Sequence, residues 1–147
     1  MQWKPRATVA AIVEDNGRFL LVEEETERGN RFNQPAGHLE DNESLIEAVI
    51  RETLEETAYA FKPEALLGIY HWKHEHNDTT YLRFAYVGSV SDHQPDLALD
   101  KGIIRTVWMT AEEIRSHAKL MRSAQVITCI EDYLSGQNFP LSVVTHL

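Results

Sequence analysis

The first quarter of the chain alternates short apolar runs with polar turns, a pattern typical of β-strands. Residues 6–14 predict a buried strand, and residues 18–23 predict a second one. Between them lie Asn16 and Gly17, a dipeptide that favours a two-residue hairpin because both residues tolerate positive φ. Residues 24–42 are polar, so we expect a long loop there, and a loop of this length is usually functional.

A helical pattern extends from residue 44 to residue 57, and Ser44 with Glu47 matches the capping box that begins a helix. Apolar segments and polar stretches alternate along the rest of the chain. Strands are expected at 66–72, 80–87 and 103–109, and helices are expected after Thr110 and over 123–134. This interleaving predicts an α/β (mixed α+β) fold in which helices flank a mixed sheet.

The chain of 147 residues has the length of one domain, so we expect a single domain over residues 1–147. Its apolar runs are too short to cross a bilayer, and no apolar signal region follows the N-terminus. The expectation is therefore a cytoplasmic protein without a membrane partner. The lone Cys129 cannot form an internal disulfide and is expected on the apolar side of the last helix. The pattern leaves the oligomeric state open.

Acidic residues exceed basic residues: 23 Asp and Glu against 14 Lys and Arg give a formal net charge of −9. This field repels a phosphate backbone, so a nucleic-acid partner is not expected. A small phosphorylated ligand remains compatible with the charge if a divalent cation lies between its phosphates and the carboxylates.

One face of the helix over 44–57 gathers three carboxylates, those of Glu52, Glu55 and Glu56, within an arc of about 100°. Like charges at these spacings repel one another, and the macrodipole disfavours negative charge near a helix C-terminus. A divalent cation would remove the conflict, and Mg²⁺ prefers carboxylate oxygens. On charge pattern alone, the alternative is the solvated face of a surface helix.

The spacing around this helix is more specific than its charge. The segment from residue 37 to residue 59 resembles the motif of the Nudix hydrolases, G-x5-E-x7-R-E-U-x-E-E-x-G-U, in which U is bulky and apolar. The matching residues are Gly37, Glu43, Arg51, Glu52, Glu55 and Glu56. Two positions depart from it. Thr53 stands at an apolar position, and Ala58 replaces the glycine that ends the helix, where φ > 0 is costly for a residue with a Cβ.

This resemblance implies an α/β/α sandwich with a central mixed sheet and a catalytic loop–helix–loop. Within the family, the stretches NQPAGHLE and RETLEETAY are similar to the bacterial NudJ-type phosphatases. Members of that group act on nucleoside di- and triphosphates and on the pyrophosphate of the thiamine pyrimidine precursor (HMP-PP). The implied activity is hydrolysis of a phosphoanhydride bond in a small molecule, by attack of water on phosphorus.

The resemblance also implies roles for the matched residues. The implied ligands of Mg²⁺, for which Mn²⁺ can substitute, are the Gly37 carbonyl and the carboxylates of Glu52, Glu55 and Glu56. Either Glu52 or Glu55 can instead be the base that takes a proton from water. Arg51 orients its carboxylate neighbours, and Glu43 fixes the junction of loop and helix. Glu40 is a weaker candidate, either a ligand or a hydrogen-bonding residue of the loop.

Contacts to substrate are expected outside the motif. The candidate phosphate contacts are Lys4, Arg6 and Arg83, and the candidate stacking rings are Phe32 and Trp72, with ordinary surface cations and core packing as the alternatives. For His71, His74 and His76 the alternatives are a solvated loop, a proton shuttle or phosphate contact, and a zinc site. Asp100 is a candidate further metal ligand, and Trp108 is expected in the core.

Two other functions compete with the hydrolase. A catalytically silent Nudix-fold module could sense a metabolite or bind a protein, but the motif retains all of its Glu and Arg residues. An enzyme that processes RNA caps or other nucleic acid is disfavoured because the chain is acidic and has no basic stripe. The sequence therefore favours a Mg²⁺-dependent hydrolase of a small-molecule phosphoanhydride.

Overall fold

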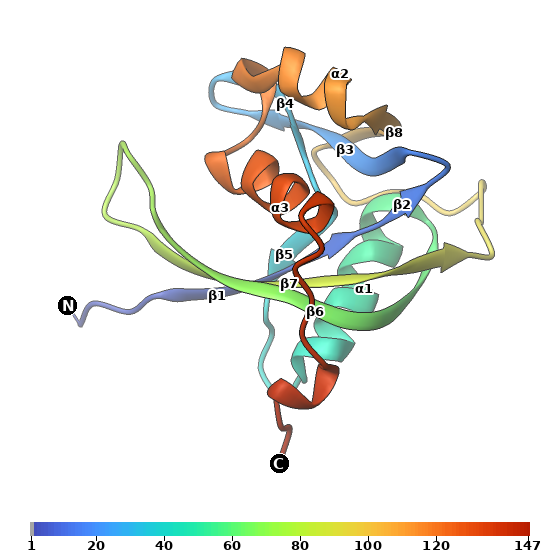
Figure 1. Cartoon of the computed structure of the whole chain (residues 1–147). Coiled ribbons are helices and arrows are strands. Elements are labelled where there is room, and N and C mark those ends of the chain that lie inside the picture. The colour runs from blue at the N-terminus through green and yellow to red at the C-terminus, as the bar shows by residue number, and fades with distance from the viewer. Residues whose placement is uncertain (1) are drawn as a thin grey trace.

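The computed structural model describes residues 2–147, which form eight strands, three α-helices and two 3₁₀ turns (Figure 1). The strands are β1 (Arg6–Ile12), β2 (Glu14–Asp15), β3 (Arg18–Thr26), β4 (Gly29–Asn33), β5 (Ala36–His38), β6 (Ala60–Lys73), β7 (Thr80–Ser91) and β8 (Ile103–Thr110). The helices are α1 (Leu45–Thr57), α2 (Ala111–Ser116) and α3 (Ala124–Leu134), and the 3₁₀ turns are η1 (Ala118–Leu120) and η2 (Leu141–Val143). Within these residues, no helix is both long and apolar enough to cross a membrane.

The strands divide into two sheets. In the first, the order is β5-β1-β7-β6, with β1 parallel to β7 and the other pairs antiparallel. In the second, β3 pairs antiparallel with β2, β4 and β8. The first sheet is therefore the mixed sheet that the interleaved pattern predicts.

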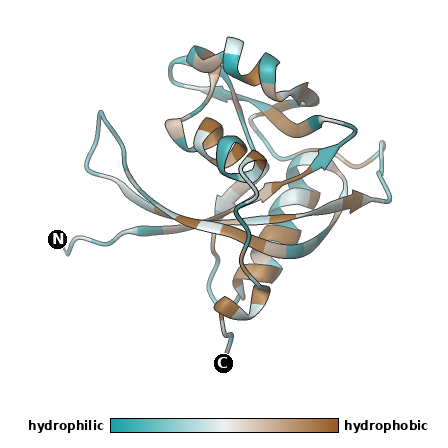
Figure 2. Cartoon of the chain, viewed as in Figure 1, coloured by the Kyte–Doolittle hydropathy of each residue, from teal (hydrophilic) through white to brown (hydrophobic). Residues whose placement is uncertain are grey.

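Alternate residues of the first sheet face two helices on opposite sides. Leu66 of β6 and Tyr86 of β7 belong to the core cluster that includes α1, whereas Leu67 and Ala85 belong to the cluster that includes α3. Figure 2 shows apolar residues along the central strands and on both helices, and polar residues at the loops and the tip of the β6–β7 hairpin. This layering confirms the expected α/β/α sandwich, and Trp108 packs against the first of these clusters, as expected for a core residue.

The segment 24–42 differs from the loop that its polarity predicts. It contains the end of β3 and the whole of β4 and β5. Of the five residues of β4, only Phe32 is buried. The strand is therefore held by backbone pairing with β3 and carries little of the apolar alternation by which a strand is recognised in a sequence.

Helix α1 begins and ends with local hydrogen bonds. The Ser44 hydroxyl accepts from the Glu47 backbone N–H at 3.0 Å, and the Glu47 carboxylate accepts from the Ser44 backbone N–H at 2.9 Å. The buried Thr53 hydroxyl donates to the Val49 carbonyl at 2.7 Å, which satisfies the polar atom at an apolar position of the motif. Ala58 adopts the left-handed conformation at φ 62°, so the helix ends as it would with glycine, at a cost of about 1–2 kcal/mol.

Candidate active site

Arg51 of α1 lies at the centre of a group of carboxylates. Its guanidinium donates hydrogen bonds to Glu43 at 2.6 and 3.0 Å, to Glu52 at 2.8 Å, to Glu55 at 3.1 Å and to the His38 carbonyl at 3.1 Å, and lies 3.4 Å from Glu40. These hydrogen bonds hold the pKa of Glu43 below its usual range. Arg51 therefore orients the carboxylates of α1 and ties the helix to the strand and loop before it.

Replacing Arg51 with Gln is expected to lower the free energy of unfolding in chelator by about 2–4 kcal/mol, because partly buried carboxylates lose their shared cation. Chemical denaturation measures the loss. The matched control is Arg115→Gln, which breaks an exposed pair with Glu131 (2.6 and 2.8 Å) and should cost far less, because solvent screens exposed ion pairs. Equal losses in the two variants would contradict the role of Arg51.

Gly37 lies in β5 against the carboxylate of Glu52. A Cβ at this position would overlap all three atoms of that carboxylate group, so only glycine leaves room for it. Glu52 is buried, and burial raises its pKa despite the hydrogen bond from Arg51. Glycine is therefore required at residue 37 because a larger residue would overlap the Glu52 carboxylate. Backbone conformation is not the reason, since the φ of Gly37 is not positive.

Glu56 is buried to the same extent as Glu52, each with a residue exposure of 8%. One oxygen accepts a hydrogen bond from the Ala36 backbone N–H at 3.0 Å. Burial raises the pKa of Glu56 to about 9, and the charges of Glu52, Glu24 and Asp100 add to the effect. An ionised Glu56 thus needs a cation beside it to offset its loss of hydration.

In the metal-free protein, Glu56 is expected to make stability depend on pH. The folded state keeps this proton until the pH approaches about 9, whereas the unfolded chain releases it near 4.5, so the native state binds more protons in this window. The free energy of unfolding should therefore fall as pH rises across the window, by up to about 1.4 kcal/mol per pH unit. Denaturation in chelator measures the slope. It should flatten in Glu56→Gln, and an equal slope in both proteins would contradict the prediction.

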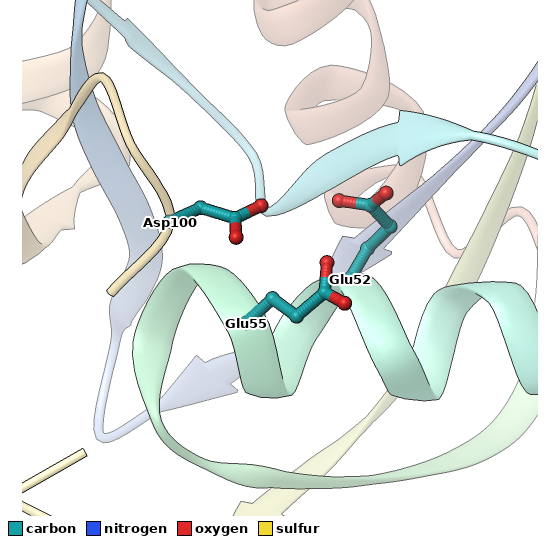
Figure 3. A group of neighbouring side chains, drawn as sticks. All are labelled: Glu52, Glu55 and Asp100. Carbon is teal, nitrogen blue, oxygen red and sulfur yellow. The ribbon is translucent and has the colours of Figure 1, made fainter. Parts of the chain in front are cut away.

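A further carboxylate approaches from the loop between β7 and β8. Oxygen atoms of Glu52, Glu55 and Asp100 lie within 4.8 Å of one another, and Figure 3 shows the three side chains facing a common space. The Asp100 backbone N–H donates to the Glu55 carbonyl at 2.9 Å, which fixes the loop to α1. Carboxylate oxygens at this spacing, next to the buried Glu56, fit a hard divalent cation such as Mg²⁺.

A cleft of about 1260 Å³ lies beside this group and includes Glu52 in its lining. Gly37, Glu52 and Glu56 line one part of it, and Trp72 and Tyr81 line another. The rings of Trp72 and Tyr81 stack, with centroids 5.8 Å apart and planes at 22°. The cleft therefore joins a potential cation site to a flat aromatic surface.

The structure brings some of the other candidate residues to this cleft. Those that line it are Glu40, Trp72, His74, His76 and Arg83. Arg83 is buried, and its guanidinium donates to Gln34 at 2.8 Å and to Asn33 at 3.0 Å. His74 and His76 lie in the hairpin beside Trp72, where His74 Nδ1 accepts from the His76 backbone N–H at 3.1 Å. Across residues 2–147, the histidines do not converge into a metal-binding group.

The remaining candidates lie elsewhere. Lys4 and Arg6 are exposed and do not line the cleft. Burial lowers the pKa of His38, and the charge of the nearby Arg6 lowers it further. Phe32 is buried in the core with Met121 and does not line the cleft. His71 is exposed outside the cleft, and Cys129 is buried in the core.

Sequence reasoning missed several residues that line the cleft: Arg28, Asn33, Arg122, Ser123 and Gln125. Gln125 carries a usable signal, because it lies four positions before Cys129 and so shares the apolar face of α3. A polar residue on such a face requires a partner or a ligand. The others stand in turns and strand ends, where polar residues are common.

A family model for the NUDIX domain matches residues 3–128. Phosphatase NudJ of Escherichia coli strain K12 is 38% identical over 142 residues, which cover 97% of this chain and 92% of that protein. A NUDIX hydrolase from Nitrosomonas europaea has 48% sequence identity and a TM-score of 0.95, over 98% of each chain. The MutT protein from Methanosarcina mazei Go1 shares the fold at 22% identity, with a TM-score of 0.74 over 93% of this chain and 99% of that one. The chain therefore belongs to the NUDIX family and is a hydrolase of phosphoanhydride bonds in small phosphorylated molecules.

Proposed function

We propose that this chain, as a single domain over residues 1–147, is a Mg²⁺-dependent pyrophosphohydrolase. Its substrates are small nucleoside di- or triphosphates or HMP-PP. The observation that carries the proposal is one continuous cleft, with the carboxylates of Glu52 and Glu56 on one wall and the stacked Trp72 and Tyr81 on another. A diphosphate joined to a flat ring matches both surfaces.

The metal would be held by oxygen atoms of the motif. The proposed ligands are the carboxylates of Glu52, Glu55 and Glu56 with the Gly37 carbonyl, and Asp100 is a further ligand because its carboxylate faces Glu52 and Glu55. Stabilisation of the charge that develops on phosphate oxygens is the chemistry that bound Mg²⁺ supplies, and Mn²⁺ can replace it.

The chain's own residues then position and activate water. Glu52 or Glu55 takes the proton from the water that attacks phosphorus, and both carboxylates receive hydrogen bonds from Arg51. Glu43 holds Arg51 from the other side with two hydrogen bonds, so it acts as a positioning residue. Glu40, 3.4 Å from Arg51, supports the same arrangement from the loop.

Two arginine side chains of the cleft are proposed to contact the part of the substrate that lies beyond the metal site. Arg28 and Arg122 are exposed residues of its lining, and Arg122 forms an ion pair with Glu24 at 2.8 Å. We propose that they contact phosphate oxygens that the metal does not reach. Trp72 and Tyr81 receive the ring of the substrate by stacking.

The test is a panel of nucleoside di- and triphosphates, nucleotide sugars and HMP-PP, incubated with Mg²⁺ in ¹⁸O-labelled water. Turnover of one group of compounds, with label in the released phosphate or pyrophosphate, is the expected result and names both the substrate and the phosphorus attacked. A ligand-induced thermal shift without turnover of any compound would instead favour the silent, metabolite-sensing module.

A further inference from the structure

Gln125 has an unused acceptor buried at the wall of the cleft. It is the second residue of α3, lines the cleft and has an exposure of 8%. Its amide nitrogen lies 3.4 Å from the Ser123 hydroxyl, whereas its buried Oε1 has no hydrogen-bond partner among residues 2–147. A buried acceptor without a partner is rare, and at a binding cleft it indicates an atom that the ligand satisfies.

Arg83 also lines the cleft and carries a buried donor without a hydrogen-bond partner. Its two terminal nitrogens donate to Gln34 and Asn33, which fix the guanidinium, and its exposure is 4%. Its buried Nε–H has no hydrogen-bond partner of its own within the described chain, and the Cys129 thiol lies beside the guanidinium. Guanidinium is only a donor, so whatever faces this nitrogen must accept a hydrogen bond.

The aromatic pair and Arg83 share one face of the first sheet. Arg83 and Tyr81 are alternate residues of β7, and Trp72 of β6 is directly opposite Tyr81. In Figure 1 the β6–β7 hairpin extends past α3, whose first residues include Gln125. A ring stacked against the aromatic pair therefore lies along the sheet face that carries Arg83, with Gln125 as the lining residue of the helix.

We propose that Gln125 and Arg83 read one edge of a planar nitrogen heterocycle. Gln125 Oε1 accepts a hydrogen bond from an exocyclic amine, and Arg83 Nε donates to an unprotonated ring nitrogen beside it. The substrate class is thus an amino-substituted ring, as in cytosine, adenine or an aminopyrimidine, rather than an imide ring such as uracil. This inference rests on the proposed function, and it gives Arg83 a role toward the ring instead of the phosphates.

The test compares two substrates that differ only by the amine: CTP, and zebularine triphosphate, which keeps the ring nitrogen and lacks the amine. The wild-type ratio of kcat/KM for CTP over zebularine triphosphate is expected to be about 10-fold or more. Gln125→Met should bring the ratio to within about 3-fold of unity. Gln125→Glu keeps acceptor oxygens and should retain a preference for the amine. ATP and purine riboside triphosphate form the equivalent purine pair.

The matched control is Gln137→Met, which makes the same chemical change outside the cleft, where the amide donates to the Leu67 carbonyl at 3.0 Å. It should leave the ratio at its wild-type value. The proposal is overturned if Gln125→Met leaves the ratio unchanged or lowers kcat/KM equally for both substrates, as a purely structural residue would. If the wild type hydrolyses no nucleotide, the kinetic ratio cannot be measured, and the proposed function fails separately only if HMP-PP is not hydrolysed either. Calorimetric binding of CMP and zebularine monophosphate to wild type and Gln125→Met then decides the proposal by the same ratio.

Discussion

Glu56→Gln is expected to lower kcat by roughly 10²–10³-fold while the folded protein remains at least as stable as the wild type in chelator. The loss follows from removing a negative oxygen ligand from a buried position of the site. The retained stability follows from burial, which raises the pKa of Glu56 to about 9. Burying the ionised carboxylate lowers the free energy of unfolding, and the neutral amide of Gln avoids this loss. Initial rates at saturating Mg²⁺ and denaturation curves in chelator measure the two effects.

Glu112→Gln is the control for this substitution, because Glu112 is exposed on α2 and does not line the cleft. It removes the same charge and should leave kcat within about 2-fold of the wild type. A Glu56→Gln protein that retains wild-type kcat would contradict the metal-site assignment, whatever its stability.

Gly37→Ala is expected to lower kcat/KM by about 100-fold, since the new methyl group displaces the Glu52 carboxylate that it would overlap. Both Glu52 and its hydrogen bond from Arg51 must then shift. Weaker affinity for Mn²⁺, measured by calorimetry, should accompany the kinetic loss.

Gly68→Ala provides the matched control. The three atoms nearest to a Cβ there are side-chain atoms of Gln137 and Tyr70 at 3.0–3.2 Å, and Gly68 does not line the cleft. We expect the kcat/KM of Gly68→Ala to remain within about 3-fold of the wild-type value. Wild-type kcat/KM and Mn²⁺ affinity in Gly37→Ala would show that the close approach of Gly37 and Glu52 has no functional role.

Much of the fold follows from local patterns in the sequence. The hairpin at Asn16 and Gly17 forms as expected, with φ values of 52° and 80°, because few other residue pairs accept that turn. Capping residues also placed the helices: Ser44, Thr110 and Ser123 are the N-caps of α1, α2 and α3. These features depend on interactions between neighbours in the chain, which a sequence displays directly.

The parts that sequence reasoning could not place depend on contacts between distant segments. Strands β4 and β5 are held by backbone hydrogen bonds to other strands. Nearly every residue carries the same backbone donor and acceptor, so the sequence does not reveal this pairing. The sequence indicated Asp100 as a candidate metal ligand, but its position beside Glu52 and Glu55 depends on the β7–β8 loop folding back onto α1. The motif fixed the spacing of the α1 carboxylates, but the aromatic and basic lining of the cleft is assembled by tertiary structure.

The central claim is that these carboxylates hold a divalent cation needed for hydrolysis. Its most direct test is the initial rate of phosphoanhydride hydrolysis by the wild-type protein with Mg²⁺, after addition of excess EDTA, and after Mg²⁺ is restored. The account predicts that EDTA abolishes turnover and that Mg²⁺ restores it to the original rate. Hydrolysis that continues unchanged in EDTA would contradict it.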